Sequence, residues 1–276
     1  MFHEIIEKYK EYLLGDKKSL NTVKKYCYVV EKMLYWLGKE PDKVGAEDLE
    51  KYKEYLAIEK KYSKNSLYTI VKGIQSFYKF LGKEEVIKNF KAPKKPEPLP
   101  NYLSEEEAHR IIESAKENLR DYAIIVLFCY SGIRVSELCD LKVNDIDFNE
   151  KIIRIRGKGG KERIVVVEEK AIEAIKNYLN DRKGKEEIVF VGRKGPLTQR
   201  EVQIVVKKYA NIAKIKKKVT PHVLRHTLAT TLLRHGADIR FIQKILGHSS
   251  IATTQVYTHV DEEALKEAYQ KSKPKY

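Results

Sequence analysis

A proline-rich run divides the chain into two parts. The ten residues KAPKKPEPLP (91–100) contain four of its eight prolines. Proline fixes φ and has no backbone N–H to donate, so this run cannot continue a helix and favours extended chain. We therefore expect a first domain over residues 1–90, a linker over residues 91–101 and a second domain over residues 102–276. A chain of 276 residues is long enough to build two cores.

The part before the prolines has the hydrophobic spacing of helices. Apolar residues recur every three or four positions, and Ser19 or Asn21 suits the start of the second helix. Four helices with short connections predict a small bundle. Lysines and tyrosines alternate across this part, which suits either contact with phosphates and bases or a solvated surface. The expected helices are Phe2–Leu14, a second one ending at Leu37, Ala46–Ile58 and Ser63–Leu81.

The part after the prolines mixes helices with one β-hairpin. Ser104 and Glu107 form a capping-box pattern at the start of a helix, and a further helix is expected over Arg120–Gly132. The run KIIRIRGKGGKERIVVV (151–167) places three glycines between two β-rich segments, which predicts a hairpin. Helices resume at Lys170, with an interruption near Ile188–Gly195. The expected fold class is mainly α, with a small β-hairpin or sheet in the second domain.

Basic residues exceed acidic ones in both parts of the chain. The formal net charge is +15 and the sequence pI is about 9.4, which suits a polyanionic partner such as nucleic acid. The alternative is a lysine-rich, highly soluble surface. All 12 arginines lie beyond residue 100. A guanidinium makes two-pronged phosphate contacts better than an ammonium does.

Several protein classes do not fit this sequence. The three cysteines Cys27, Cys129 and Cys139 form no CxxC pair, which indicates reduced intracellular thiols. The N-terminus mixes acids and bases and has no uncharged signal core. The longest apolar run, Tyr122–Tyr130, is too short to span a bilayer. We expect a cytoplasmic protein without a membrane partner.

Two short segments combine polar groups with helical spacing. In SGIRVSELCDL, Arg134 and Glu137 lie one helical turn apart, which is usually a surface ion pair of little value. The pair follows an apolar helix, so partial burial is the alternative. In HVLRHTLATTLLRHG (222–236), His222, Arg225 and His226 precede an apolar helix. A zinc-protease helix would need HExxH, but Val223 stands at the glutamate position, so a metal site is not expected. His226 is expected to be a hydrogen-bonded structural residue.

Taken together, five motifs point to one family. SGIRVSEL, GKGGKER, HVLRHTLAT, LGHSS and TTQVYTHV occur in the order and spacing of the tyrosine recombinases, the phage integrase family. The resemblance covers about residues 102–260, and the compact plan is most similar to Xer-type recombinases. It implies a two-domain clamp, in which the first domain is a helical core-binding domain that contacts DNA and the second is catalytic.

The resemblance also implies a reaction at a DNA phosphodiester. Attack on phosphorus builds negative charge, which preorganised cations stabilise. Arg134 and Arg225 would hold the two non-bridging oxygens. Tyr257, nine residues after His248, would attack and form a 3′-phosphotyrosyl intermediate that conserves the bond for rejoining.

The remaining residues that the resemblance assigns serve proton transfer and orientation. Lys158 would protonate the 5′-oxygen leaving group; Lys161 is the rival, but the spacing from Arg134 favours Lys158. His222 would assist proton transfer, His248 would hydrogen-bond a phosphate oxygen and Glu137 would orient its neighbours. The sequence lacks the GxxxxGK[ST] pattern of ATP binding, so no cofactor and no metal are expected.

The expected function is site-specific recombination by a homotetramer on two DNA duplexes, either Xer-like resolution of chromosome dimers or integration and excision. A type IB topoisomerase-like relaxing activity and a catalytically silent DNA-binding protein are the alternatives. By resemblance, the C-terminal segment 261–276, called the tail below, would dock on a neighbouring subunit. Packing of the tail on its own domain is the alternative.

Overall fold

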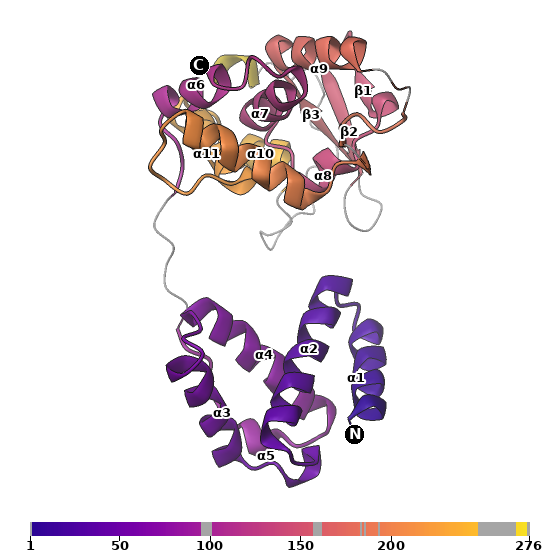
Figure 1. Ribbon diagram of the computed structural model, residues 1–276, viewed down its shortest axis with the longest axis vertical. Coiled ribbons are helices and arrows are strands. Elements are labelled where there is room, and N and C mark those ends of the chain that lie inside the picture. The colour runs from indigo at the N-terminus through magenta and orange to yellow at the C-terminus, as the bar shows by residue number, and fades with distance from the viewer. Residues whose placement is uncertain are drawn as a thin grey trace. The chain divides into compact units, whose positions relative to one another are not determined.

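The computed structural model describes residues 2–94, 101–156, 162–182, 184, 186–192, 194–247 and 269–274. The chain forms two compact units, Met1–Leu99 and Pro100–Tyr276, each with its own core (Figure 1). None of the helices in the described part is long and apolar enough to cross a membrane. Helix dominates and the strands are short, which confirms the expected fold class.

The first unit, called the helical unit, is an α-helical bundle. Its helices are α1 (His3–Gly15), α2 (Leu20–Leu37), α3 (Ala46–Ile58), α4 (Lys64–Phe80) and the short α5 (Glu84–Ile87), with a 3₁₀ turn at Pro41–Lys43. The four longer helices confirm the predicted ones. The side chains of Ser19 and Ser63 accept hydrogen bonds from the backbone N–H groups of Thr22 and Ser66, so both serine caps form. The sequence pattern did not predict α5 or the 3₁₀ turn.

The core of the helical unit is aromatic and aliphatic. Tyr9, Phe77 and Tyr78 are fully buried beside leucines and valines from α2 and α4. Phe77 packs edge-on against Tyr9 and against Tyr78, with ring centroids 5.1 and 5.5 Å apart. These edge-to-face contacts add to the burial of the rings, so large aromatic side chains hold the bundle together.

The second unit, called the catalytic unit after the role that the resemblance implies, is built around α7 (Leu119–Ser131). This helix is buried from Ala123 to Ser131 and contacts α6, α9, α10 and α11 (Figure 1). Because it is covered on all sides, its two ends are the places where polar side chains approach it. The other helices are α6 (Glu105–Glu113), α8 (Val135–Cys139), α9 (Glu169–Asp181), α10 (Gln199–Ile212), α11 (Pro221–Arg234) and α12 (Ile239–Leu246).

The predicted hairpin is part of a three-stranded antiparallel sheet. Its strands are β1 (Ile146–Asp147), β2 (Ile152–Arg156) and β3 (Glu162–Val166), and Ile155 pairs with Arg163. The residues that join β2 to β3 lie outside the described residues. The interruption expected near Ile188–Gly195 contains a second small hairpin, β4 (Val191–Gly192) with β5 (Gly195–Pro196).

A smaller apolar cluster lies beside the main core of the catalytic unit. It joins Val166 of β3, Leu228 and Leu232 of α11, three residues of α12, and Tyr269 near the end of the chain. Leu246 of this cluster also lies close to Gly132, so the C-terminal end of α12 is next to the end of α7, near the predicted catalytic arginines.

Candidate active site

Arg134 is placed by the sharp end of α7. The helix stops at Gly132, whose φ of +60° is the left-handed conformation that favours glycine. Two residues later Arg134 caps the start of α8. Its Nη1 donates to Glu137 Oε1 at 2.7 Å, and its Nη2 donates to the carbonyl of Gly247. The Arg134 side chain remains 38% exposed, so part of the guanidinium faces solvent.

Glu137 connects Arg134 to Arg163. Its two oxygens accept four hydrogen bonds, two from Arg134 (backbone N–H and Nη1) and two from Arg163, all of 2.7–2.8 Å. Burial would raise the pKa of Glu137, but the hydrogen bonds from Arg163 and Arg134 outweigh it and lower the pKa to about 2. The carboxylate is therefore charged at any physiological pH. The Glu137 side chain is only 10% exposed, so the pair is partly buried, as the apolar helix before it suggested, and is not an ordinary surface ion pair.

Arg163 is a site residue that the sequence did not reveal. It lies on β3 and holds Glu137 with both terminal nitrogens, 26 residues apart in the chain. The available signal was an arginine inside a strand-forming run, where a buried charge must find a partner. Neither its burial nor its partner could be predicted from the sequence.

Arg225 is buried inside α11. Thr220 caps this helix and Pro221 occupies its first position, both favourable for a helix start. Arg225 is 5% exposed, and its terminal nitrogens donate to the carbonyls of Gly132 and Leu246. Burial lowers its pKa to about 10, with repulsion from Arg134 and Arg163 adding to the effect. The group is still a fixed cation at neutral pH.

The two histidines of α11 face outward. His222 and His226 are both exposed, although each is within one turn of the buried Arg225. The His226 ring packs edge-on against Tyr102, with centroids 6.0 Å apart. The expectation that His226 is a hydrogen-bonded structural residue is thus replaced by a surface aromatic contact.

Three of the predicted catalytic residues, Lys158, His248 and Tyr257, lie outside the described residues, as does the rival Lys161. The residue before His248 is described. Gly247 ends α12 with a φ of +60°, the left-handed conformation that favours glycine.

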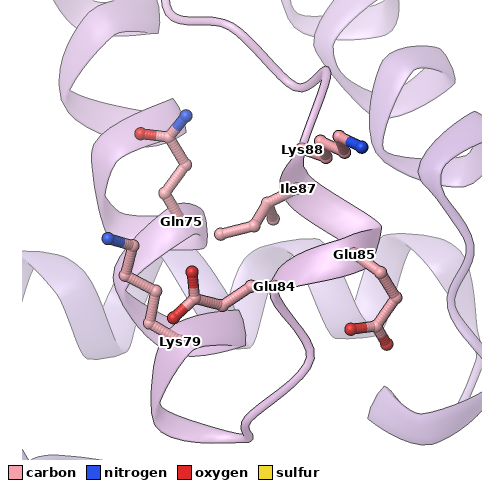
Figure 2. Close-up of a pocket in the computed structure, with 6 residues that line it drawn as sticks. All are labelled: Gln75, Lys79, Glu84, Glu85, Ile87 and Lys88. Carbon is pink, nitrogen blue, oxygen red and sulfur yellow. The ribbon is translucent and has the colours of Figure 1, made fainter.

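Among the described residues, no group of three or more histidine, cysteine, aspartate or glutamate side chains could hold a metal ion. A pocket of about 460 Å³ lies in the helical unit between α4 and α5 (Figure 2). Its lining mixes two glutamates, Glu84 and Glu85, with Lys79 and Lys88. This balance of charge does not favour a phosphate, and none of the predicted catalytic residues lines it.

The described end of the tail packs on its own domain. Tyr269 is fully buried and donates its hydroxyl hydrogen to the carbonyl of Tyr130. Lys273 Nζ lies 2.8 Å from Glu168 Oε1, and the Lys273 carbonyl is 3.2 Å from His235 Nδ1. Residues 269–274 thus follow the alternative of packing within the same chain.

Comparison with known proteins identifies the family of the chain. Residues 101–264 match the phage integrase family, and residues 5–88 match the phage integrase N-terminal SAM-like domain. The chain is 38% identical over 275 residues to tyrosine recombinase XerA of Pyrococcus horikoshii, covering 98% of this chain and 94% of that protein. It is 39% identical over 279 residues to tyrosine recombinase XerC of Thermodesulfovibrio yellowstonii, covering 94% and 92%.

Solved structures give the same result. The crystal structure of XerA recombinase aligns over 100% of both chains with a TM-score of 0.54 and 43% identity. XerH recombinase bound to its difH substrate shares the fold, with a TM-score of 0.70 at 24% identity over 91% of this chain and 79% of that one. The chain belongs to the phage integrase family, among the Xer-type tyrosine recombinases.

Proposed function

We propose that this protein is a site-specific DNA recombinase that cleaves and rejoins duplex DNA through a 3′-phosphotyrosyl intermediate. One observation carries the proposal: the guanidinium groups of Arg134, the residue before α8, and Arg225, on α11, donate to the consecutive carbonyls of Gly247 and Leu246. Two cations far apart in the sequence are thus held side by side. This is the arrangement that a phosphate with two non-bridging oxygens requires.

The arginine pair, Arg134 and Arg225, stabilises the charge that develops on the phosphate. Each guanidinium uses two of its donors to hold the protein and keeps others for a ligand. Because the groups are fixed before the substrate arrives, they need no reorganisation during the reaction.

The other roles fall to residues named by the family motifs. Tyr257 attacks phosphorus, and Lys158 protonates the departing 5′-oxygen. His222, exposed at the start of α11, assists proton transfer, and His248 hydrogen-bonds a phosphate oxygen. Glu137 orients Arg134. The reaction as proposed uses no metal and no cofactor.

The proposed substrate is double-stranded DNA with a specific site. Both the helical unit and the catalytic unit bind this DNA, and the reaction takes place in the cytoplasm. The net charge of +15 supports binding to a polyanion. Related recombinases crystallised with DNA, among them XerH with difH and a lambda integrase dimer with a core site, support the same partner class. The proposed biological role of the recombination is Xer-like resolution of chromosome dimers, or integration and excision.

The proposed assembly is a homotetramer on two duplexes, with the tail docking on a neighbouring subunit. For that docking, Tyr269 and Lys273 must exchange their own-domain contacts for equivalent ones on the neighbour. A chain ending at Val260 should bind a single DNA site normally but lose synapsis and strand exchange. Its melting temperature is measured in parallel, because the truncation also removes the buried Tyr269. Unchanged recombination by this variant would contradict tail docking.

The test of the proposed function is covalent capture. A nicked suicide substrate releases a short 5′-OH fragment, so the phosphotyrosyl protein accumulates. The parent protein should form this adduct, and Tyr257→Phe should bind the same DNA without forming it. Tyr269→Phe is the matched control and should retain the adduct, because its hydroxyl is buried against Tyr130. An adduct from Tyr257→Phe would place the nucleophile elsewhere.

Product analysis separates the proposal from its alternatives. A recombinase joins strands from two duplexes, whereas a type IB topoisomerase only relaxes supercoils. Tight DNA binding without any adduct from the parent would indicate a catalytically silent binding protein.

A further inference from the structure

Arg163 makes a two-pronged contact with Glu137. The distances Nη1–Oε1 and Nη2–Oε2 are both 2.7 Å, and the two side chains are 13% and 10% exposed. Two parallel hydrogen bonds between planar groups fix orientation as well as distance. Because both terminal nitrogens are directed at Glu137, Arg163 is not placed to hold a phosphate itself.

Arg163 also packs against Gly247, at the end of α12. A Cβ atom added to Gly247 would lie 2.7 Å from Arg163 Cδ and 2.9 Å from Nε. The arginine side chain therefore occupies the space that any other residue at position 247 would need. The carbonyl of the same glycine accepts from Arg134.

Three segments that carry or adjoin proposed catalytic residues meet at these contacts. Arg134 is the residue before α8, β3 begins four positions after Lys158 in the sequence, and Gly247 precedes His248. We propose that Arg163 is a positioning residue. Its hydrogen bonds to Glu137 and its contact with Gly247 connect β3 to the start of α8 and to the end of α12. These contacts keep Arg134 in the orientation that binds the phosphate. This inference rests on the proposed function.

Arg163 also controls how much positive charge Arg134 retains. With Arg163 present, two guanidinium groups share the single carboxylate of Glu137, which leaves a net positive charge. Without Arg163, Glu137 would pair with Arg134 alone and neutralise it. The carboxylate of Glu137 would also lose the two hydrogen bonds that fix its orientation. Both changes weaken the attraction of Arg134 for developing negative charge.

The first experiment measures single-turnover cleavage of the suicide substrate at saturating protein. Arg163→Met keeps the aliphatic stem and should slow cleavage by about 10- to 100-fold, the usual cost of small misplacements in an active site. The DNA dissociation constant should stay within about threefold, because this buried group contributes little to phosphate binding. Arg163→Lys should be intermediate, since a point charge cannot hold both oxygens.

The matched control is Arg154→Met. Arg154 lies on the neighbouring strand β2 with its side chain 52% exposed, so its cleavage rate should equal that of the parent. The inference is overturned if Arg163→Met cleaves within about threefold of the parent, or if its loss lies wholly in DNA affinity.

A double substitution separates positioning from general damage to the fold. In an Arg134→Lys background, adding Arg163→Met should slow cleavage by less than about threefold, because the group being positioned is already gone. Losses that multiply would show that Arg163 acts independently of Arg134 and would overturn the inference.

A second variant tests the same contact from the other side, even if Arg163→Met does not fold. Gly247→Ala should displace the Arg163 side chain and slow cleavage. Gly236→Ala is its control, because Gly236 also has a positive φ, +84°, but has no atom within 4 Å of the added Cβ. Equal rates for the two alanine variants would overturn the inference. Absence of an adduct from the parent would instead refute the proposed function.

Discussion

The two units differ in how they treat charge. In the described part of the helical unit, every buried residue is apolar or aromatic, whereas the catalytic unit buries Asp121 and Arg225 and nearly buries Glu137 and Arg163. The helical unit carries its positive charge on lysines alone, and the arginines all belong to the catalytic unit. Solvent-exposed charges attract DNA over several ångströms, and salt weakens this attraction. Buried charges that are held by hydrogen-bond partners have a fixed position and are screened much less.

This difference predicts that substitutions in the two units will affect different properties of the protein. Substitutions of buried charges in the catalytic unit should change the rate of chemistry and the stability of that unit. Substitutions of exposed lysines in the helical unit should change DNA affinity and its dependence on salt.

The largest effect is expected for the arginine pair. Arg134→Ala or Arg225→Ala should slow cleavage by a factor of about 100 or more, as for other losses of a transition-state donor. Duplex affinity should fall far less, because many other basic groups share the phosphate contacts. Single-turnover rates at saturation and fluorescence anisotropy give the two values. Equal losses in both would remove the distinction between the units.

The next effect concerns acid stability. The pKa of Glu137 is lowered from 4.5 to about 2, so its contribution is present above pH 4.5 and is lost as the pH falls from there towards 2. This contribution is roughly 3 kcal/mol at most. Glu137→Gln should therefore destabilise the catalytic unit at neutral pH and flatten its acid dependence.

Trp36, the single tryptophan, provides the readout for that experiment. It lies in the helical unit, where it stacks on Tyr55 at 4.8 Å between ring centroids. On acidification, far-UV circular dichroism should change at a pH where Trp36 fluorescence is still native. Coincident transitions would show that the helical unit is equally acid-sensitive.

A smaller effect contrasts two buried hydroxyl groups. Tyr269 in the catalytic unit donates to the carbonyl of Tyr130, whereas the Tyr78 hydroxyl in the helical unit has no partner among the described residues. Tyr269→Phe should lower the free energy of unfolding by about 1 kcal/mol, while Tyr78→Phe should leave it unchanged or raise it. Chemical denaturation measures both. Shifts of the same sign would contradict the contrast.

The smallest effect is expected for a single lysine of the helical unit. Lys72 is exposed on α4 and bonds to the neutral Gln75, so its charge is not balanced by that partner. Lys72→Ala should weaken duplex binding by about threefold and lower the salt slope by about 1, with the saturated cleavage rate unchanged. Lys8→Ala is the control, because Glu4 already pairs with Lys8 at 2.6 Å. Equal affinities for the two variants would favour the interpretation of α4 as a solvated surface.

Much of the local structure could be predicted because its causes are local. Helical spacing and serine caps predicted the four longer helices of the first unit, and the capping box of Ser104 with Glu107 forms as expected. The glycine-rich run between β-rich segments predicted the hairpin of β2 and β3. The short elements α5, β4 and β5 escaped prediction, since a few residues carry too little periodicity.

In the candidate site, the residue identities could be predicted but their burial could not. The family motifs predicted Arg134, Glu137, His222 and Arg225, because motif spacing is a property of the sequence. They could not predict that Arg225 is buried while His222, on the same helix, is exposed. Burial depends on which elements pack against α11, and this is a property of the whole unit.

By itself, then, the sequence determined the helices, the hairpin, the two-part division and the family. Only the tertiary structure decided which partner each buried charge would have. Arg163 meets Glu137 across 26 residues, and Arg225 meets the carbonyl of Gly132 across 93. No local preference encodes such contacts. They form because folding brings the end of α7, β3 and the end of α12 to one place, where a charge removed from water must find a partner.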